Sequence, residues 1–130
     1  MIYELNILTT PVPKARPRHT ATHTYTPQKT KDYERLIADE WAIRYGNLKP
    51  SEKPIEAFIT FYMPIPKSKK KEVKTKQWHV KKPDIDNLAK AIMDSLNGLA
   101  YKDDSQIYSL TLLKTYSESP SIYLKIEESE

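Results

Sequence analysis

Apolar positions along the chain follow two periods, one typical of strands and one typical of helices. Four runs rich in β-branched and aromatic residues predict strands, at 2–8, 55–66, 106–116 and 121–126. Apolar residues recur at steps of three and four in two further segments, which predicts helices at 29–48 and 86–98. The segment 14–28 has neither period and is punctuated by threonine and proline, so it is typical of an exposed loop.

Each predicted helix presents one apolar face to a core. The first face consists of Tyr33, Leu36, Ile37, Trp41 and Tyr45, and the second of Leu88, Ile92, Leu96 and Leu99. A glycine lies near the end of each helical segment, in Gly46-Asn47 and in Asn97-Gly98. Such pairs are typical of a helix end, so both helices are expected to stop there.

The order strand, helix, strand, helix, strand, strand predicts an α+β domain with a small mixed sheet and two main helices. The run 55–66 is almost continuously apolar, which predicts an interior strand. Glu118-Ser119-Pro120 predicts a hairpin between the last two strands. A length of 130 residues fits a single domain over 1–130, in which 67–82 forms a lysine-rich loop and 127–130 a frayed acidic tail.

Composition excludes several classes of function. The chain has no cysteine, so it has no disulfide framework, thiol nucleophile or cysteine zinc site. It has two glycines, far apart, and therefore lacks the glycine-rich loops that bind nucleotide cofactors. The start of the chain lacks the basic residues of a secretory signal, and no uncharged run approaches the roughly 18 residues of a membrane span. We therefore expect a cytoplasmic protein that contacts no membrane and binds no nucleotide cofactor.

Positive charge is concentrated in one segment. The whole chain has a formal charge of +4, whereas 67–82 holds eight lysines and one glutamate, a local charge of +7 that leaves −3 for the remainder. This distribution favours a polyanionic partner such as DNA. The candidate DNA contacts are Lys14, Arg16, Arg18, Lys69, Lys70, Lys71, Lys74, Lys76, Trp78, Lys81 and Lys82.

Each of these basic elements also has an ordinary structural interpretation. The lysine-rich segment can be a solvated surface loop, since charge runs often are. The element around Lys14 can be a loop tethered by nearby carboxylates. Trp78 can stack on an exposed base or serve as a partly buried anchor, and the sequence leaves both interpretations open.

Aspartate is clustered directly after the lysine-rich segment. Five of the seven aspartates fall within 21 residues and give that stretch a charge of −3, namely Asp84, Asp86, Asp94, Asp103 and Asp104. Carboxylates that converge from separate elements hold Mg²⁺. In an extended segment Asp84 and Asp86 share one face, and the following helix can return the chain so that Asp103-Asp104 meets them. Taken singly, each aspartate can instead be a helix cap or part of an ion pair.

Asp86, Lys90 and Asp94 lie on one helical face, at positions i, i+4 and i+8. An ammonium beside a metal-bound phosphate can neutralise the charge that develops on phosphoryl oxygens. A basic segment next to an acidic cluster therefore favours phosphodiester chemistry, in which lysines hold the polyanion and carboxylates hold its metal.

The acidic stretch also resembles a known family. The run Lys82-Pro83-Asp84-Ile85-Asp86-Asn87-Leu88-Ala89-Lys90, followed by Asp94, Leu96-Asn97-Gly98 and Asp103-Asp104-Ser105-Gln106-Ile107, resembles the RusA family of Holliday junction resolvases. The opening Pro-Val-Pro-Lys-Ala-Arg-Pro-Arg and Tyr25-Thr26-Pro27 are similar to its phage-type members. The resemblance implies a homodimeric endodeoxyribonuclease of the prokaryotic or phage-infected cytoplasm that resolves four-way DNA junctions by paired symmetrical nicks.

The same resemblance implies roles for individual residues. It implies that Asp84, Asp86 and Asp104 hold Mg²⁺, for which Mn²⁺ can substitute, and Asp103 is a further candidate ligand. It implies that Lys90 is the catalytic lysine, supported by Asp94. A water activated by the metal would then attack the phosphodiester.

Two alternatives remain open from the sequence. The first is a metal-dependent nuclease for flaps or other branched DNA. The second is a non-catalytic basic DNA-binding module, which explains the basic segments equally well and leaves the clustered aspartates unexplained.

Overall fold

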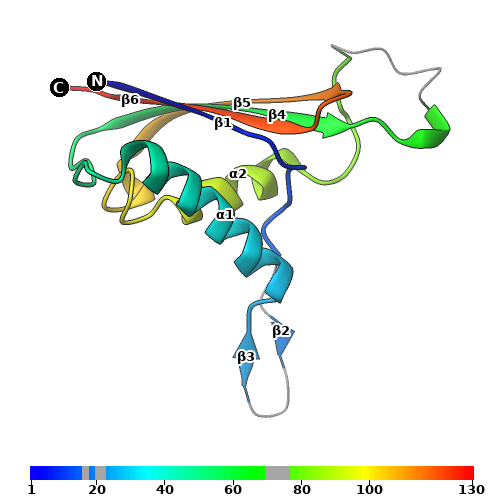
Figure 1. The fold of residues 1–130 in the computed structure, drawn as a ribbon, viewed down its shortest axis with the longest axis horizontal. Helices are drawn as coiled ribbons and strands as arrows, with labels where there is room; N and C mark the ends of the chain where they lie inside the picture. Colours follow the sequence, from blue (N-terminus) through cyan, green and yellow to red (C-terminus); the bar gives the residue numbers. More distant parts are fainter. Residues whose placement is uncertain (16–17, 20–22, 70–76) are drawn as a thin grey trace.

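Two helices cover one face of a four-stranded sheet, and the two chain ends lie together at one end of that sheet (Figure 1). The computed structural model describes residues 1–15, 18–19, 23–69 and 77–130 of the chain. The helices and the strands of the sheet are α1 (Gln28–Tyr45), α2 (Ile85–Ser95), β1 (Ile2–Ile7), β4 (Ile55–Pro64), β5 (Ile107–Ser117) and β6 (Ser121–Glu128). The predicted α+β domain with a small mixed sheet and two main helices is therefore confirmed.

The strand order in the sheet is β1-β6-β4-β5. β4 is an interior strand, as its nearly continuous apolar run predicts, and it pairs in parallel with β5 and antiparallel with β6. β1 pairs antiparallel with β6 and forms one edge, while β5 forms the other. Of the described helices, none is both long and apolar enough to span a membrane.

The predicted hairpin between the last two strands is wrong. β5 and β6 lie on opposite sides of β4 and do not pair with each other, so the connection through Glu118 and Pro120 crosses the end of β4. That connection lacks the Asn-Gly or Asp-Gly pair that closes a tight hairpin. An interior β4 also satisfies its backbone hydrogen bonds on both sides, which its burial requires.

The core lies between the sheet and the helices. Alternate residues of β1, β4 and β6 are buried there, at Tyr3, Leu5, Ile7, Ile55, Ala57, Ile59, Phe61, Met63, Ile122, Leu124 and Ile126. α1 contributes Tyr33, Ile37 and Trp41 to this core, and α2 contributes Leu88, Ala91 and Ile92. Leu36, which the sequence places on the buried face of the first helix, is 37% exposed. Thr30 is buried instead, so the stripe runs along positions 30, 33, 37 and 41.

The segment predicted as a loop contains a short ribbon. β2 (Arg18–His19) pairs antiparallel with β3 (Thr24–Tyr25), and this ribbon projects from the domain just before α1 (Figure 1). The prediction of a loop throughout 14–28 is therefore wrong at these positions. Threonine and tyrosine favour extended backbone, and a ribbon of two residue pairs is too short to show a period in sequence.

The prediction of a frayed tail at 127–130 is also wrong. β6 continues to Glu128, whose carboxylate accepts hydrogen bonds from the Tyr3 hydroxyl and, at 2.9 Å, from the Ser51 hydroxyl. The hydrogen bond to Glu128 is the main cause that raises the pKa of Tyr3 to about 12, and it also lowers the pKa of Glu128. The Ser129 amide donates to the Pro54 carbonyl at 2.9 Å, so the end of the chain is tied to the sheet.

We predict that Glu128→Gln lowers the free energy of unfolding at neutral pH by about 1 kcal/mol, because two hydroxyls lose a charged acceptor. The pKa of Glu128 is lower in the folded state than in the unfolded state. Its contribution to the free energy of unfolding is therefore fully present above the unfolded-state pKa of about 4.3. That contribution is lost as the pH falls through the folded-state value. Urea titrations at neutral and acidic pH measure the effect, with Glu130→Gln as the control. Equal stability of the two variants at neutral pH would contradict the prediction.

Candidate active site

The packing of α2 determines which of its side chains face solvent. Its apolar face is buried through Leu88 and Ile92, while Asp86, Asn87 and Lys90 are exposed. These exposed residues carry the chemistry that the sequence singles out. The candidate site therefore lies on the solvent side of α2 rather than inside the core.

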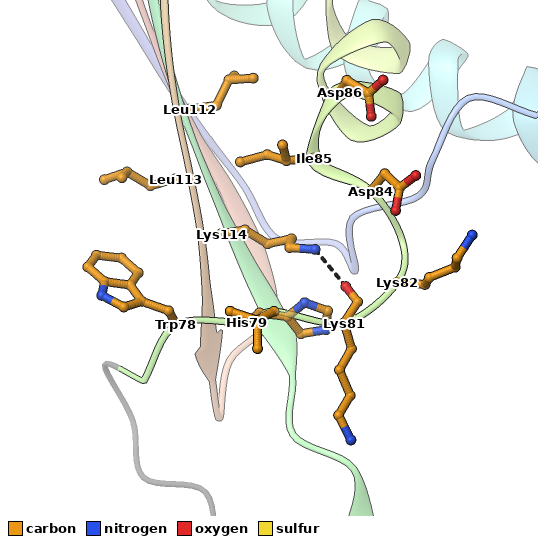
Figure 2. A pocket seen from close by; sticks show the side chains of 11 residues that line it. Trp78, His79, Lys81, Lys82, Asp84, Ile85, Asp86, Leu112, Leu113 and Lys114 are labelled. Carbon is orange, nitrogen blue, oxygen red and sulfur yellow. Dashed lines mark hydrogen bonds between the residues drawn. The ribbon is translucent and has the colours of Figure 1, made fainter.

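Asp84 and Asp86 stand at the beginning of α2. Asp84 occupies the N-cap position with extended backbone, and its carbonyl accepts a hydrogen bond from the Leu88 amide at 3.2 Å. Its side chain makes no capping hydrogen bond. Figure 2 shows both carboxylates on the same side of the helix start, while Ile85 points toward β5. The expected extended segment is wrong, since Asp86 is already helical, but the two carboxylates do share a side.

A groove of about 720 Å³ opens between this helix start and β5 (Figure 2). Asp84 and Asp86 provide its acidic wall, and the apolar side chains of Leu112 and Leu113 come from β5. The remaining polar and aromatic lining residues are Trp78, His79, Lys81, Lys82 and Lys114. Acidic and cationic groups therefore face one cavity, as the charge pattern of the sequence suggests.

Trp78 lies at the rim of the groove. Its backbone forms a bridge to Thr115, and its side chain is 60% exposed, so the indole is not a buried anchor. Together with Leu113 it also lines a second hollow, of about 420 Å³, whose other walls include Tyr62. The ring thus stands between two concave surfaces with its faces accessible to a ligand.

His79 is the most enclosed polar residue of the groove. It is 9% exposed, its ring packs against Tyr116 with the ring centres 4.8 Å apart, and its Nδ1 has no hydrogen-bond partner among the described residues. Burial is the main cause that lowers its pKa, and the positive charge of Lys114 adds to this effect. Both effects favour the neutral imidazole.

Lys90 and Asp94 lie one turn apart on α2, with Nζ 3.8 Å from Oδ2. The same Asp94 oxygen lies 3.3 Å from Nζ of Lys14, which also contacts Glu34 of α1 at 2.7 Å. Partial burial opposes the charge of Lys14, but the two carboxylates outweigh it and raise the pKa of this lysine. The Lys14 amide donates to the Asn87 carbonyl at 2.9 Å. Lys14 is thus tethered by local carboxylates, the arrangement that the sequence leaves open.

Asp103 and Asp104 follow the other end of α2 and are held by local contacts. Asp103 accepts a hydrogen bond from the Ser105 amide at 3.1 Å. Hydrogen bonding to the Ser105 side chain is the main cause that lowers the pKa of Asp103, and the contact with the amide adds to it. Its own amide donates to the Gln106 side chain at 2.9 Å, which completes a capping box. The Asp104 amide donates to Asn97 at 2.9 Å, in the turn after α2.

The expected convergence of three carboxylates on a metal is not seen. Among the described residues, no group of three or more His, Asp or Glu side chains is placed to hold a metal ion. α2 has 11 residues and is therefore about 16 Å long, and it separates the Asp84-Asp86 pair from Asp104. Mg²⁺ commonly uses one or two carboxylates and completes its coordination with water and substrate phosphates. Asp84 and Asp86 fit such a site, because neither accepts a hydrogen bond or ion pair from any described side chain.

Apart from Lys14 and Trp78, whose positions are given above, the predicted DNA contacts divide into three groups. Lys81 and Lys82 are exposed at the groove, with their side chains directed outward in Figure 2. For Arg18 and Lys69 the structure describes only the backbone. The remaining candidates lie outside the described residues, namely Arg16, Lys70, Lys71, Lys74 and Lys76.

Lys114 is a residue of the groove that the sequence pattern does not single out. Its Nζ donates to the carbonyl oxygens of Lys81 and Pro83, each at 2.6 Å, just before Asp84. Burial is the main cause that lowers its pKa, and the charge of Asp84 opposes this effect. A single lysine within a strand pattern carries no signal of its own, because its role depends on the register of β5 against β4.

A family profile and a phage relative both identify the RusA family. The sequence profile of the family described as Endodeoxyribonuclease RusA matches residues 9–127. A Bacillus subtilis protein, "Uncharacterized protein YqaN", is 34% identical over 132 residues, covering 91% of this chain and 90% of the relative. The "Crossover junction endodeoxyribonuclease rusA" of Lactococcus phage r1t is 30% identical over 108 residues, covering 77% of this chain and 79% of the relative. The profile match spans the groove, α2 and the Asp103-Asp104 pair.

We predict that Lys14→Met lowers the free energy of unfolding by about 1 kcal/mol, because two partly buried carboxylates lose their shared cation. Lys82→Met is the matched variant, since Lys82 is exposed and forms no ion pair with a described residue. Lys82→Met should leave stability unchanged and reduce the salt dependence of DNA binding by roughly one phosphate contact. Urea unfolding and salt titrations of DNA affinity separate the two effects. A Lys14→Met variant with parental stability would show that the tether is not significant.

Proposed function

Because the chain belongs to the RusA endodeoxyribonuclease family, we propose that it resolves four-way DNA junctions by paired, symmetrical hydrolysis of phosphodiester bonds. Family membership makes the chain an endodeoxyribonuclease, and the choice of junction is the further step. The observation that carries the hydrolysis is the pair of carboxylates at the start of α2, which make no side-chain hydrogen bond and face a groove bordered by lysines. The choice of a junction as substrate rests on the phage relative that is named for crossover junctions.

In this proposal Asp84 and Asp86 hold Mg²⁺, or Mn²⁺ in its place. A divalent cation at this position supplies Lewis-acid chemistry, since it offsets charge on the phosphodiester and makes a water molecule easier to deprotonate. The match to the family motif also proposes Asp104 as a third ligand and Asp103 as a further candidate, but both follow the opposite end of α2 and are not grouped with Asp84 and Asp86 among the described residues. The partial positive charge at the N-terminus of α2 favours both the carboxylates and an incoming phosphate.

Lys90 is the proposed catalytic lysine. It lies one turn beyond Asp86 on the exposed face of α2, and its side chain is 60% exposed and thus accessible to DNA. Its ammonium would neutralise charge on the phosphoryl oxygens as the bond breaks. Asp94, 3.8 Å from Nζ, would hold the lysine toward the same face.

The proposed DNA path runs along the basic rim of the groove. Lys81 and Lys82, the last two residues of the lysine-rich segment 67–82, lie just before the Asp84-Asp86 pair and line the same groove. Contacts of this kind bind the phosphate backbone without regard to sequence. Exposed Trp78 would add a stacking surface for an unpaired base, which a branch point offers more readily than a continuous duplex.

A homodimer follows from the symmetry of the proposed substrate. A four-way junction presents two equivalent strands for cleavage, and a two-fold dimer presents two identical sites. Paired nicks then require that both sites act while one junction stays bound.

We predict that Asp86→Asn abolishes cleavage of a synthetic four-way junction while junction binding survives, because the amide cannot serve as an anionic metal ligand. A fall in rate of about a thousandfold would correspond to the several kcal/mol that a metal supplies. Gel assays of nicking and of binding, with and without EDTA, measure the two properties. Asp39→Asn, an exposed aspartate of α1 that pairs only weakly with Arg35, is the control.

The choice of DNA substrate tests the junction proposal itself. A junction, a flap and a linear duplex of the same sequence should be compared, and symmetrical cuts confined to the junction are expected. Preferential flap cleavage would contradict resolution as the function. Retained Mg²⁺-dependent cutting by Asp86→Asn would contradict the metal-site assignment.

We predict that Trp78→Ala weakens junction binding about tenfold, since stacking of a base on an aromatic ring contributes roughly 1–3 kcal/mol. Trp78→Phe should retain most of the affinity because it keeps an aromatic face. Val80→Ala is the control, since Val80 is 84% exposed in the same groove and has no aromatic face. Equal affinities for Trp78→Ala and the parent would exclude a stacking role.

A further inference from the structure

Lys114 occupies a position that ordinarily suits an apolar residue. In the register of the sheet it lies beside Phe61, which is fully buried, on the face that the helices cover. A cation at a core-facing position loses hydration, and this loss requires a compensating interaction. No described carboxylate forms an ion pair with Lys114 within 4.0 Å, so the compensation comes from elsewhere.

The compensating contacts are made to backbone carbonyls. Nζ of Lys114 donates to the carbonyls of Lys81 and Pro83 at 2.6 Å each, three residues and one residue before Asp84. Figure 2 shows this ammonium directed from β5 across the groove toward that backbone. Hydrogen bonds from a charged donor are short and strong, so the two contacts fix the chain where it enters α2.

Further hydrogen bonds attach the same segment to β5. The Tyr116 amide donates to the Gln77 carbonyl at 2.9 Å, and the His79 amide donates to the Lys114 carbonyl at 3.0 Å. The chain from Gln77 onward therefore lies along the edge of β5. The side chain of Lys114 makes the last two attachments before the helix, at Lys81 and Pro83.

We propose that Lys114 is a positioning residue for the Asp84-Asp86 pair: its ammonium fixes the backbone that leads into α2 and thereby the direction of the Asp84 carboxylate. Asp84 depends on such support because its side chain makes no capping hydrogen bond. The inference rests on the proposed function, which assigns the task of the two carboxylates. Lys114 acts through the backbone and not by contact with the reacting atoms.

A purely structural role makes a different prediction. Inward-pointing lysines on edge strands also prevent strands from pairing with other molecules. If Lys114 had only that role, its removal would change stability or association and leave the turnover of folded protein unchanged. Methionine has a similar length and no charge, so Lys114→Met fills the same space and removes the desolvation cost.

The test compares Lys114→Met and Lys114→Arg with Lys125→Met. Lys125 is a strand lysine over the Phe58 ring, on the opposite face of the sheet, and is the matched control. Lys114→Met should lower kcat for junction cleavage by about a hundredfold, the effect of a small misplacement of a reacting group, with an unchanged Kd for the junction. Lys114→Arg should recover much of the activity, because a guanidinium can donate to both carbonyls.

A second measurement needs neither metal nor DNA. In Lys114→Met, hydrogen exchange of the His79 and Leu88 amides should be faster than in the parent and in Lys125→Met, because the His79 amide attaches the held segment to the Lys114 carbonyl of β5 and the Leu88 amide donates to the Asp84 carbonyl where that segment ends. Lys114→Gln, which is too short to reach both carbonyls, replaces the methionine variant if that variant does not fold.

The outcomes separate this inference from the proposed function. An unchanged kcat, or unchanged exchange at both amides, would overturn the role of Lys114. If the parent cuts no branched DNA, the proposed function fails, whereas the exchange measurement still decides whether Lys114 fixes the start of α2.

Discussion

The packing of α2 against the sheet is the constraint on which the candidate site depends. Leu88, Ala91 and Ile92 are buried, and the helical period therefore directs Asp86 and Lys90 into solvent. A rotation by one residue, roughly 100°, would expose Leu88 and bury a charge without a partner. Hydrophobic packing thus sets the direction of the reactive groups.

Local sequence patterns predict the elements of this fold better than their arrangement. Periodicity places both helices and the four strands of the sheet, and an almost continuous apolar run correctly places β4 in the interior. The pairing of β5 and β6 was mispredicted because neighbours in sequence were taken as neighbours in the sheet. The strand order depends on contacts between distant segments, which include the pairing of β1 with β6. No local window contains that information.

The same distinction applies to the site. Residue type and helical spacing are local, and they are sufficient to place Asp86 and Lys90 on one exposed face. The roles of Lys14 and Lys114 depend on partners that are distant in sequence. Lys14 contacts the carboxylates of Glu34 and Asp94, and Lys114 donates to two backbone carbonyls. In the sequence, Lys14 is a candidate DNA contact or a tethered loop residue, and Lys114 carries no signal of its own. The convergence of Asp104 with Asp84 likewise depended on the path of a whole helix, and the structure does not show it.

Two aspartates of this chain precede helical turns, and they are used differently. Asp103 caps the short helix Asp104–Gln106 with its side chain, as aspartates at such positions commonly do. Asp84 occupies the same kind of position before α2, a longer helix, and makes no such bond, although a cap typically contributes about 1 kcal/mol. The Lys114 ammonium holds the backbone there instead, through the carbonyls of Lys81 and Pro83. The Asp84 carboxylate makes no capping hydrogen bond, and its segment is held by other groups, so this carboxylate is available to an external ligand. Such a loss of local stability is expected at a functional site.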